Sequence, residues 1–173
     1  TNQTDLFSFS PNFVKKKILK FNMPKINQPK YLSALNFALK LHSKQMRKGT
    51  QIPYFFHLSS VSNHVIENNG NTDEAIAGLL HDAVEDQGGE KILRLIKKKF
   101  GTKVARIVED CTDTKIVPKP PWFDRKKKYI ADLEKKAQSS LLVSICDKTH
   151  NASCIVNDYY RVGKKIWNRF SAN

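Results

Sequence analysis

The chain has 173 residues, of which 40% are hydrophobic, 10% aromatic and 27% charged, and this composition excludes a disordered or low-complexity protein. With 30 Lys and Arg against 16 Asp and Glu, the formal net charge of +14 favours an anionic partner: nucleic acid, an acidic membrane surface or a phosphorylated small molecule. No apolar run is long enough to span a membrane, and residues 1–22 lack the apolar core of a signal peptide, so we expect no membrane partner. The three cysteines form no CxxC pair, which favours the cytoplasm.

The sequence divides into two segments. Residues 1–28 are predicted to be a basic N-terminal arm, because they contain a lysine run at 15–17 and no sustained amphipathic period. Residues 29–173 are predicted to form one helical domain, whose first helix begins near Pro29. In that helix, the stripe expected to face the core of the domain consists of Leu32, Leu35, Leu39, His42 and Met46.

The next two helices lie on either side of an Asn-Asn-Gly turn at 68–70. The first is predicted to begin near His57, with an apolar face made of Leu58, Val61, Val65 and Ile66. Asn71 and Glu74 then have the spacing of a capping box, which predicts a helix from Thr72 to about Asp86. That helix is apolar nearly all round, so we expect it in the middle of a bundle.

The second half of the chain contains four more helical patterns. Apolar residues predict one helix through Ile92, Ile96 and Phe100, and another, after Gly101, through Val104, Ile107, Val108 and Cys111. A basic helix near Trp122 is predicted to face inward with Tyr129, Ile130 and Leu133. The apolar run 141–146 could form a short strand, but Ala152, Ile155 and Val156 continue a helical period, so helix is preferred. Because no βαβ alternation occurs, the predicted fold class is all-α.

The polar end of the most apolar helix predicts a metal site. His81 and Glu85 are four residues apart, as are Asp82 and Asp86, so each pair lies on one helix face. Side chains of adjacent residues point about 100° apart on a helix, which still lets His81 and Asp82 reach a common point. An imidazole with a carboxylate suits Mn, Fe or Zn, and a cation offsets the cost of burying carboxylates. Two further polar residues beside buried segments, His57 and Asp147, would complete the set.

The order of these motifs resembles the HD-superfamily hydrolase domain of the RelA/SpoT type, whose members degrade the alarmone (p)ppGpp. The resemblance covers about residues 30–170, and its matching stretches are residues 45–50, 53–58, 79–86, 100–104, 125–129 and 147–151. It implies an HD-domain helical bundle. The synthetase half of the long bifunctional enzymes has no counterpart in this sequence.

The resemblance also implies a set of roles. One divalent ion, usually Mn²⁺, would be bound by His57, His81, Asp82 and Asp147, and it would acidify a water and polarise a phosphoryl oxygen. Glu85 and Asp86 would orient and deprotonate that water. The reaction would remove the 3′-pyrophosphate from (p)ppGpp, leaving GDP or GTP.

Substrate contacts are implied for five further residues. Arg47 and Lys48 resemble the Arg-Lys pair beside the nucleotide, and Asn151 lies one turn beyond Asp147. Arg125 and Lys126 are further candidates for phosphate contact. Two positions depart from the pattern, since Gln87 stands where Thr or Ser often follows the Glu-Asp pair and Cys154 stands where some relatives carry Thr.

Other interpretations of these residues remain open at this point. The His-Asp pair could cap a helix or form a salt bridge, and Glu85, Asp86, Arg47 and Lys48 could be solvated. The enzyme could be an HD phosphohydrolase acting on another phosphorylated nucleotide, since the metal chemistry would be shared. A non-catalytic basic module that binds nucleic acid would show strongly salt-dependent binding, but it leaves the buried acid and histidine cluster unexplained, so nucleic acid is the least favoured partner. Oligomeric state does not follow from the sequence.

Overall fold

Helices make up nearly all the regular structure of residues 25–114 and 120–170, the parts of the chain described by the structure, which is a computed structural model. In chain order they are α2 (Gln28–Leu41), α3 (Phe55–Glu67), α4 (Thr72–Leu80), α5 (Ala83–Gln87), α6 (Gly89–Phe100), α7 (Thr102–Cys111), α8 (Trp122–Ala131), η1 (Leu133–Lys135), α9 (Gln138–Val162) and η2 (Gly163–Arg169). Within these residues the only β pairing is an isolated bridge between Met46 and Pro53. The predicted all-α class is confirmed. The proposed arm lies outside the described residues except for residues 25–28, and α2 already begins at Gln28.

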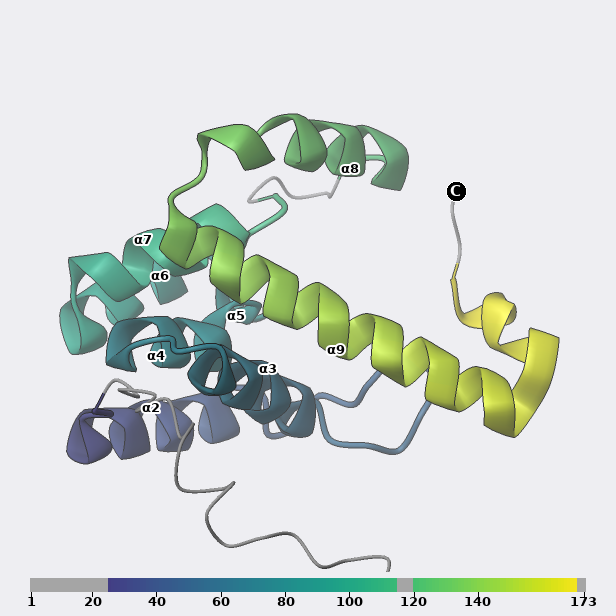
Figure 1. The fold of residues 1–173 in the computed structure, drawn as a ribbon, viewed down its shortest axis with the longest axis horizontal. Helices are drawn as coiled ribbons and strands as arrows, with labels where there is room; N and C mark the ends of the chain where they lie inside the picture. Colours follow the sequence, from purple (N-terminus) through teal and green to yellow (C-terminus); the bar gives the residue numbers. More distant parts are fainter. Residues whose placement is uncertain (1–24, 115–119, 171–173) are drawn as a thin grey trace, which may run out of the picture.

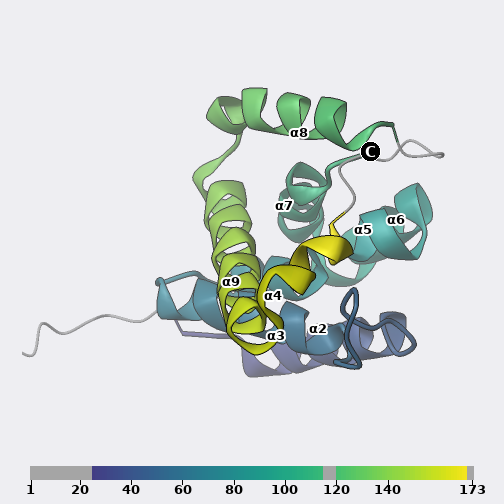
Figure 2. The same cartoon turned by 90° about the vertical axis from the view of Figure 1, so that its right-hand side faces the viewer.

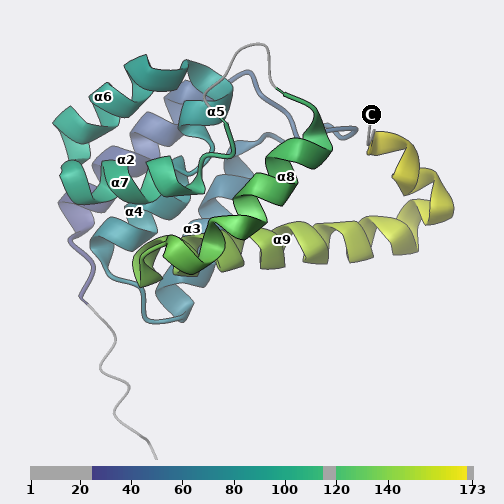
Figure 3. The same ribbon diagram turned by 90° about the horizontal axis from the view of Figure 1, so that it is seen from above.

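Helix α4 lies at the centre of the bundle and packs against α2, α3, α7 and α9. The long helix α9 runs across one side of the molecule, and η2 turns back at its C-terminal end (Figures 1 and 3). Helix α8 stands apart on another side and has no buried residue (Figure 2). The site described below lies where α3, α9 and the turn after α4 meet.

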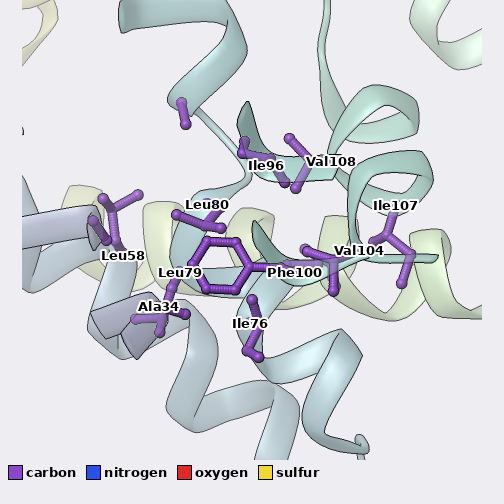
Figure 4. Packing of buried hydrophobic residues seen from close by; sticks show 14 of the residues in the cluster. Ala34, Leu58, Ile76, Leu79, Leu80, Ile96, Phe100, Val104, Ile107 and Val108 are labelled. Atoms are coloured by element: carbon purple, nitrogen blue, oxygen red, sulfur yellow. The ribbon is translucent and has the colours of Figure 1, made fainter. Parts of the chain in front are cut away.

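The core is built on the apolar surface of α4. Every residue from Ala75 to Leu80 is buried, as predicted for a helix that is apolar all round. Figure 4 shows Ile76, Leu79 and Leu80 gathered with Phe100 and with side chains of the neighbouring helices. Each of these large side chains contributes about 1.5–3 kcal/mol when fully removed from water. The core therefore holds α4 in place from several directions.

The predicted capping box at the start of α4 is confirmed. The side-chain oxygen of Asn71 accepts hydrogen bonds from the backbone N–H groups of Asp73 and Glu74, at 3.0 and 3.3 Å. The Glu74 carboxylate accepts the backbone N–H of Asn71 at 2.8 Å. These bonds satisfy donors that would otherwise lack partners at a helix start. They define the first residue of the helix that leads to the site.

The predicted inward face of α2 is right at two positions, since His42 is buried and Leu35 is half-buried against the core, and wrong at Leu32, Leu39 and Met46. The buried residues of α2 are Ala34 and Ala38, followed by His42 at the C-cap, whereas Leu32 and Leu39 are exposed. Because alanine lets two helix backbones approach closely, the small-residue face of α2 is the face that packs against α4. Met46 is also exposed, since α2 ends at Leu41 and the chain continues as a loop.

The predicted single helix from Thr72 to Asp86 is in fact two helices. Helix α4 ends at Leu80, His81 and Asp82 form a turn, and α5 begins at Ala83. The Nδ1 atom of His81 lies 2.9 Å from the carbonyl oxygen of Gly78. His81 and Glu85 are therefore not on one continuous helix, so the i, i+4 spacing that predicted their shared face does not apply. The break aims both His81 and Asp82 toward α3 and α9.

Helix α8 also differs from its prediction at two positions, because it ends at Ala131 and Leu133 lies in η1, and because Ile130 points outward. Ile130, expected to face inward, is 65% exposed. The half-buried residues of α8 are Arg125, Lys126 and Tyr129. The reason is that α8 packs chiefly against η1 rather than against the bundle, so its inner side is polar.

Gly78 of α4 lies close against the backbone of α3. A Cβ atom built on Gly78 would lie 3.0 Å from the Cα and 3.2 Å from the backbone nitrogen of Ser62. Alanine favours a helix by about 1 kcal/mol over glycine, but the Ser62 backbone cannot rotate away, and overpacking costs about 1–3 kcal/mol. We expect Gly78→Ala to lower the free energy of unfolding, measured by urea denaturation, by about 1 kcal/mol. The exposed α9 substitution Ser153→Ala is the control, and an unchanged or raised value for Gly78→Ala would contradict the close contact.

Candidate active site

Two histidines and two aspartates converge between α3, the turn after α4, and α9. His57 lies in the first turn of α3 and Asp147 in the middle of α9. The Nε2 atom of His57 is 3.2 Å from Oδ1 of Asp147, and the Nε2 atom of His81 is 3.5 Å from the same oxygen. The Oδ2 atom of Asp82 is 2.9 Å from Nε2 of His81 and 3.7 Å from Nε2 of His57. His57, His81 and Asp147 thus face one point, and Asp82 lies beside both imidazole rings.

The donor atoms of this cluster fit a divalent cation. His57, His81 and Asp147 each offer one ligand atom, and the three atoms lie within 4.8 Å of one another. The Nε2 atoms of His57 and His81 are buried, and among the described residues neither makes a hydrogen bond of acceptable geometry. A buried polar atom without a partner costs about 1–3 kcal/mol. A cation held by nitrogen and oxygen atoms would remove that cost, with Asp82 as a further oxygen donor.

Both imidazole rings have their second nitrogen occupied. Nδ1 of His81 donates to the carbonyl oxygen of Gly78, which leaves the lone pair on Nε2. Nδ1 of His57 lies 2.8 Å from Nδ1 of His150. Burial, with the charges of His57 and Arg47, lowers the pKa of His150 to about 4, so a neutral His150 can accept a hydrogen bond from the Nδ1–H of His57. The lone pair of His57 then also lies on Nε2.

The two carboxylates are held by neighbouring donors. The hydroxyl of Tyr54 donates to Oδ2 of Asp82 at 2.6 Å. The amide of Asn151 donates to Oδ1 of Asp147 at 2.6 Å, and the ammonium of Lys148 donates to Oδ2 of Asp147 at 2.5 Å. Burial and the nearby Asp82 raise the pKa of Tyr54 well above its usual value, so its hydroxyl remains a donor.

The electrostatics of the cluster favour a positive charge between the rings and the carboxylates. Burial acts to lower the pKa of His81, but the nearby carboxylates of Asp82 and Asp147 raise that pKa well above its usual value. Burial acts to raise the pKa of Asp82, and His81, His57 and Tyr54 together hold it well below the usual range. The pKa of Asp147 is lowered in the same way against burial, by His57, His81 and Lys148. A bound divalent ion would take the place of the proton on His81.

Glu85 and Asp86 lie beside this cluster on α5. Both line a pocket of about 190 Å³ together with Asp82 and Asp147. Oε1 of the half-buried Glu85 lies 3.9 Å from the guanidinium of Arg125. Asp86 is exposed and accepts a hydrogen bond from the side-chain amide of Gln45 at 2.8 Å. The group of atoms that could hold an ion consists of His57, His81 and Asp147 alone; Asp82 is outside it but contacts both rings, whereas Glu85 and Asp86 share only the pocket.

A larger pocket of about 380 Å³ adjoins the small one. Arg47, Lys48 and Asn151 line it, and Asn151 and Tyr54 line both pockets. The guanidinium of Arg47 donates to the side-chain oxygen of Asn151 at 3.0 Å. Three of the predicted substrate contacts therefore surround one pocket next to the histidine and aspartate cluster. Cys154 lies in the wall of the same space.

The other two predicted substrate contacts share a partner. The side chains of Arg125 and Lys126 both donate to Oδ2 of the buried Asp113, with a distance of 2.7 Å for Lys126. Lys126 lines the small pocket, whereas Arg125 lines a different pocket on the α8 side of the molecule. The structure thus brings Lys126 into the pocket beside the histidine and aspartate cluster. Arg125 stays outside that pocket and lies near Glu85.

Several residues of the site were not predicted from the sequence. Tyr54, Gln45 and Lys148 lie inside the stretches that resemble the hydrolase family, so the signal was present but carried no role. Asp113 lies outside those stretches and contacts α8 only in the folded chain.

Within the described ranges, no helix has the length and apolar character needed to cross a membrane.

The fold and the histidine and aspartate cluster define a class of helical metal-binding domains. A family model described as an HD domain matches residues 34–173. The chain belongs to the HD domain family.

Curated relatives carry one recurring name. The chain is 37% identical over 123 residues to guanosine-3′,5′-bis(diphosphate) 3′-pyrophosphohydrolase MESH1 of Xenopus tropicalis, covering 69% of this chain and 66% of the relative. The human protein of the same name is 34% identical over the same shares. A pyrophosphohydrolase of Aquifex aeolicus is 38% identical over 79 residues, covering 46% of this chain and 11% of the relative. The chain thus spans a little under two thirds of the length of its animal relatives.

One solved structure is similar in fold. It is described as a metazoan ortholog of SpoT that hydrolyses ppGpp and plays a role in starvation responses. The TM-score is 0.67 at 25% sequence identity, and the match covers 81% of this chain and 84% of the other. The predicted HD-domain helical bundle is confirmed.

Proposed function

We propose that the protein hydrolyses guanosine 3′,5′-bis(diphosphate) and the corresponding pentaphosphate, releasing pyrophosphate from the 3′ position and leaving GDP or GTP. The observation that carries the proposal is the pair of buried Nε2 atoms, on His57 and His81, that face carboxylates beside an acid-lined pocket. The names of the animal relatives support this choice of substrate. The free thiols of the three cysteines fit a reducing compartment such as the cytoplasm.

His57, His81, Asp82 and Asp147 would hold one divalent ion, which we propose is Mn²⁺. Such an ion lowers the pKa of a water and withdraws charge from a phosphoryl oxygen. Glu85 orients the attacking water and accepts its proton, and Asp86 holds the water from the same side of the pocket. Tyr54 keeps the Asp82 carboxylate in one orientation through its hydroxyl.

The nucleotide would occupy the larger pocket. Arg47 can stack on the base or bind phosphate through its planar guanidinium, and Lys48 and Asn151 supply further donors. Lys126 reaches the small pocket and would contact the 3′-phosphates, with Arg125 behind it. The net charge of +14 raises the rate at which such an anion encounters the protein.

The test is to incubate the metal-loaded protein with ppGpp and measure pyrophosphate and GDP. We expect equal amounts of the two products, loss of activity with chelator, and recovery when Mn²⁺ is restored. Turnover of another phosphorylated nucleotide with ppGpp left intact would instead favour an HD phosphohydrolase of different specificity. Metal-independent, salt-sensitive binding of nucleic acid without any hydrolysis would contradict both enzymes.

A further inference from the structure

A chain of side-chain contacts connects the core to Asp86. His42 is buried at the C-cap of α2, and its Nδ1 atom lies 2.7 Å from Oε1 of Gln45. The amide of Gln87 donates to the same oxygen at 2.5 Å. The amide nitrogen of Gln45 donates to Oδ2 of Asp86 at 2.8 Å. Gln45 thus accepts on one side and donates on the other.

The directions of these hydrogen bonds determine how Gln45 is oriented. An amide oxygen only accepts, so the 2.7 Å contact with Oε1 is a hydrogen bond when His42 carries its proton on Nδ1, although the Gln87 amide nitrogen also lies 3.3 Å from that atom. Burial lowers the pKa of His42, which keeps the ring neutral and able to adopt that tautomer. A flipped Gln45 amide would set its NH₂ group against the donors of His42 and Gln87 and its oxygen against the Asp86 carboxylate. The contacts therefore allow only the orientation in which Gln45 donates to Asp86.

The backbone of Gln45 is held independently of its side chain. Its N–H donates to the carbonyl oxygen of His42 at 3.0 Å, and its carbonyl oxygen accepts the N–H of Tyr54 at 2.8 Å. The His42 ring also stacks on the Tyr54 ring, with centroids 5.6 Å apart. A change of the Gln45 side chain can therefore remove the bond to Asp86 while these backbone bonds hold the loop that carries Arg47.

Asp86 is an exposed residue on a helix of only five residues, and the Gln45 amide bonds its carboxylate directly. We propose that Gln45 is a positioning residue, which uses the buried His42 and the neighbouring Gln87 to hold the Asp86 carboxylate in the orientation that serves the attacking water. This inference rests on the proposed function. The Gln45 side chain acts through Asp86 and needs no contact with the substrate.

The experiment is a double-mutant cycle on pyrophosphate release from ppGpp. We expect Gln45→Leu to lower kcat by about 10- to 100-fold, because small misplacements of reacting groups carry costs of this size. The KM for ppGpp and the affinity for Mn²⁺, measured by calorimetry, should stay within about threefold, because the Gln45 side chain contacts neither ligand set. In an Asp86→Asn background, Gln45→Leu should change kcat by less than about twofold, because the group it positions is already lost.

Two further variants complete the design. Gln51→Leu makes the same chemical change at an exposed position of the same loop and should leave kcat unchanged. Gln87→Leu leaves the bond from Gln45 to Asp86 but removes one of its two supports, so it should lower kcat less than Gln45→Leu and only when Asp86 is present. This variant also decides the case if Gln45→Leu does not fold.

The outcomes separate the two proposals. Equal losses of kcat with and without Asp86, or a loss matched by weaker Mn²⁺ binding, would overturn the positioning role while the hydrolase activity stands. Wild-type protein that releases no pyrophosphate from ppGpp would instead overturn the proposed function, and the positioning role with it.

Discussion

Replacing Asp147 with alanine is expected to abolish tight binding of a divalent ion and to reduce pyrophosphate release by on the order of 10³-fold or more. The Oδ1 atom of Asp147 faces the Nε2 atoms of both His57 and His81, at 3.2 and 3.5 Å, so its loss removes the carboxylate shared by the two rings. Metal content after dialysis and calorimetric titration with Mn²⁺ would measure the effect.

Asp132→Asn is the matched control for this prediction. Asp132 is a half-exposed aspartate that pairs with Lys135 at 3.1 Å and lines neither of the two pockets beside the histidine and aspartate cluster, so this variant should bind Mn²⁺ like the wild type. Thermal unfolding of both variants distinguishes loss of the site from loss of the fold. An Asp147→Ala protein that folds and still binds one equivalent of Mn²⁺ with unchanged affinity would show that the cluster is not the metal site.

Replacing Glu85 with glutamine is expected to lower kcat by about 10²- to 10⁴-fold while metal binding is retained. Glutamine has nearly the same size and shape as glutamate but cannot accept a proton at this position. Glu85 lines the small pocket with Asp82 and Asp147 and is outside the group of ligand atoms, so its loss should affect the chemical step rather than ion binding. Steady-state kinetics on ppGpp with Mn²⁺ titrations would test this.

Glu134→Gln, an exposed change in η1, serves as the control for Glu85→Gln and should leave kcat and KM unaltered. A Glu85→Gln enzyme with kcat within about tenfold of the wild type would transfer the role of base to Asp86. A Glu85→Gln protein that loses Mn²⁺ would instead place this carboxylate among the ligands.

Most helices could be predicted because their signals are local. The capping box of Asn71 and Glu74, the glycine at 101 and the apolar spacing of Ile92, Ile96 and Phe100 each act within one or two turns, and each was confirmed. The interpretation of residues 141–146 as helix was also confirmed, because α9 extends the same period to Val162. Local propensity is sufficient where it agrees with the packing.

The proposed metal ligands were chosen from residue type and order, since His57, His81, Asp82 and Asp147 each stand beside an apolar segment. That pattern suggests a buried polar group but says nothing of distance. The convergence of the four side chains depends on the packing of α9 against α3 and α4. These helices are far apart in the sequence. The orientation of Tyr54, His150 and Gln45 toward these groups depends on the same packing.

Local pattern was therefore enough for the all-α class, the helix starts and the chemical types at the site, because a helix is encoded by neighbours three or four residues apart. Three features depend on contacts with other elements instead: the alanine face of α2, the end of α4 before His81 and Asp82, and the pairing of Asp113 with α8. In each case a distant element supplies the partner atoms. A helical period cannot reveal which face meets a partner, or where side-chain contacts outweigh the continuation of a helix.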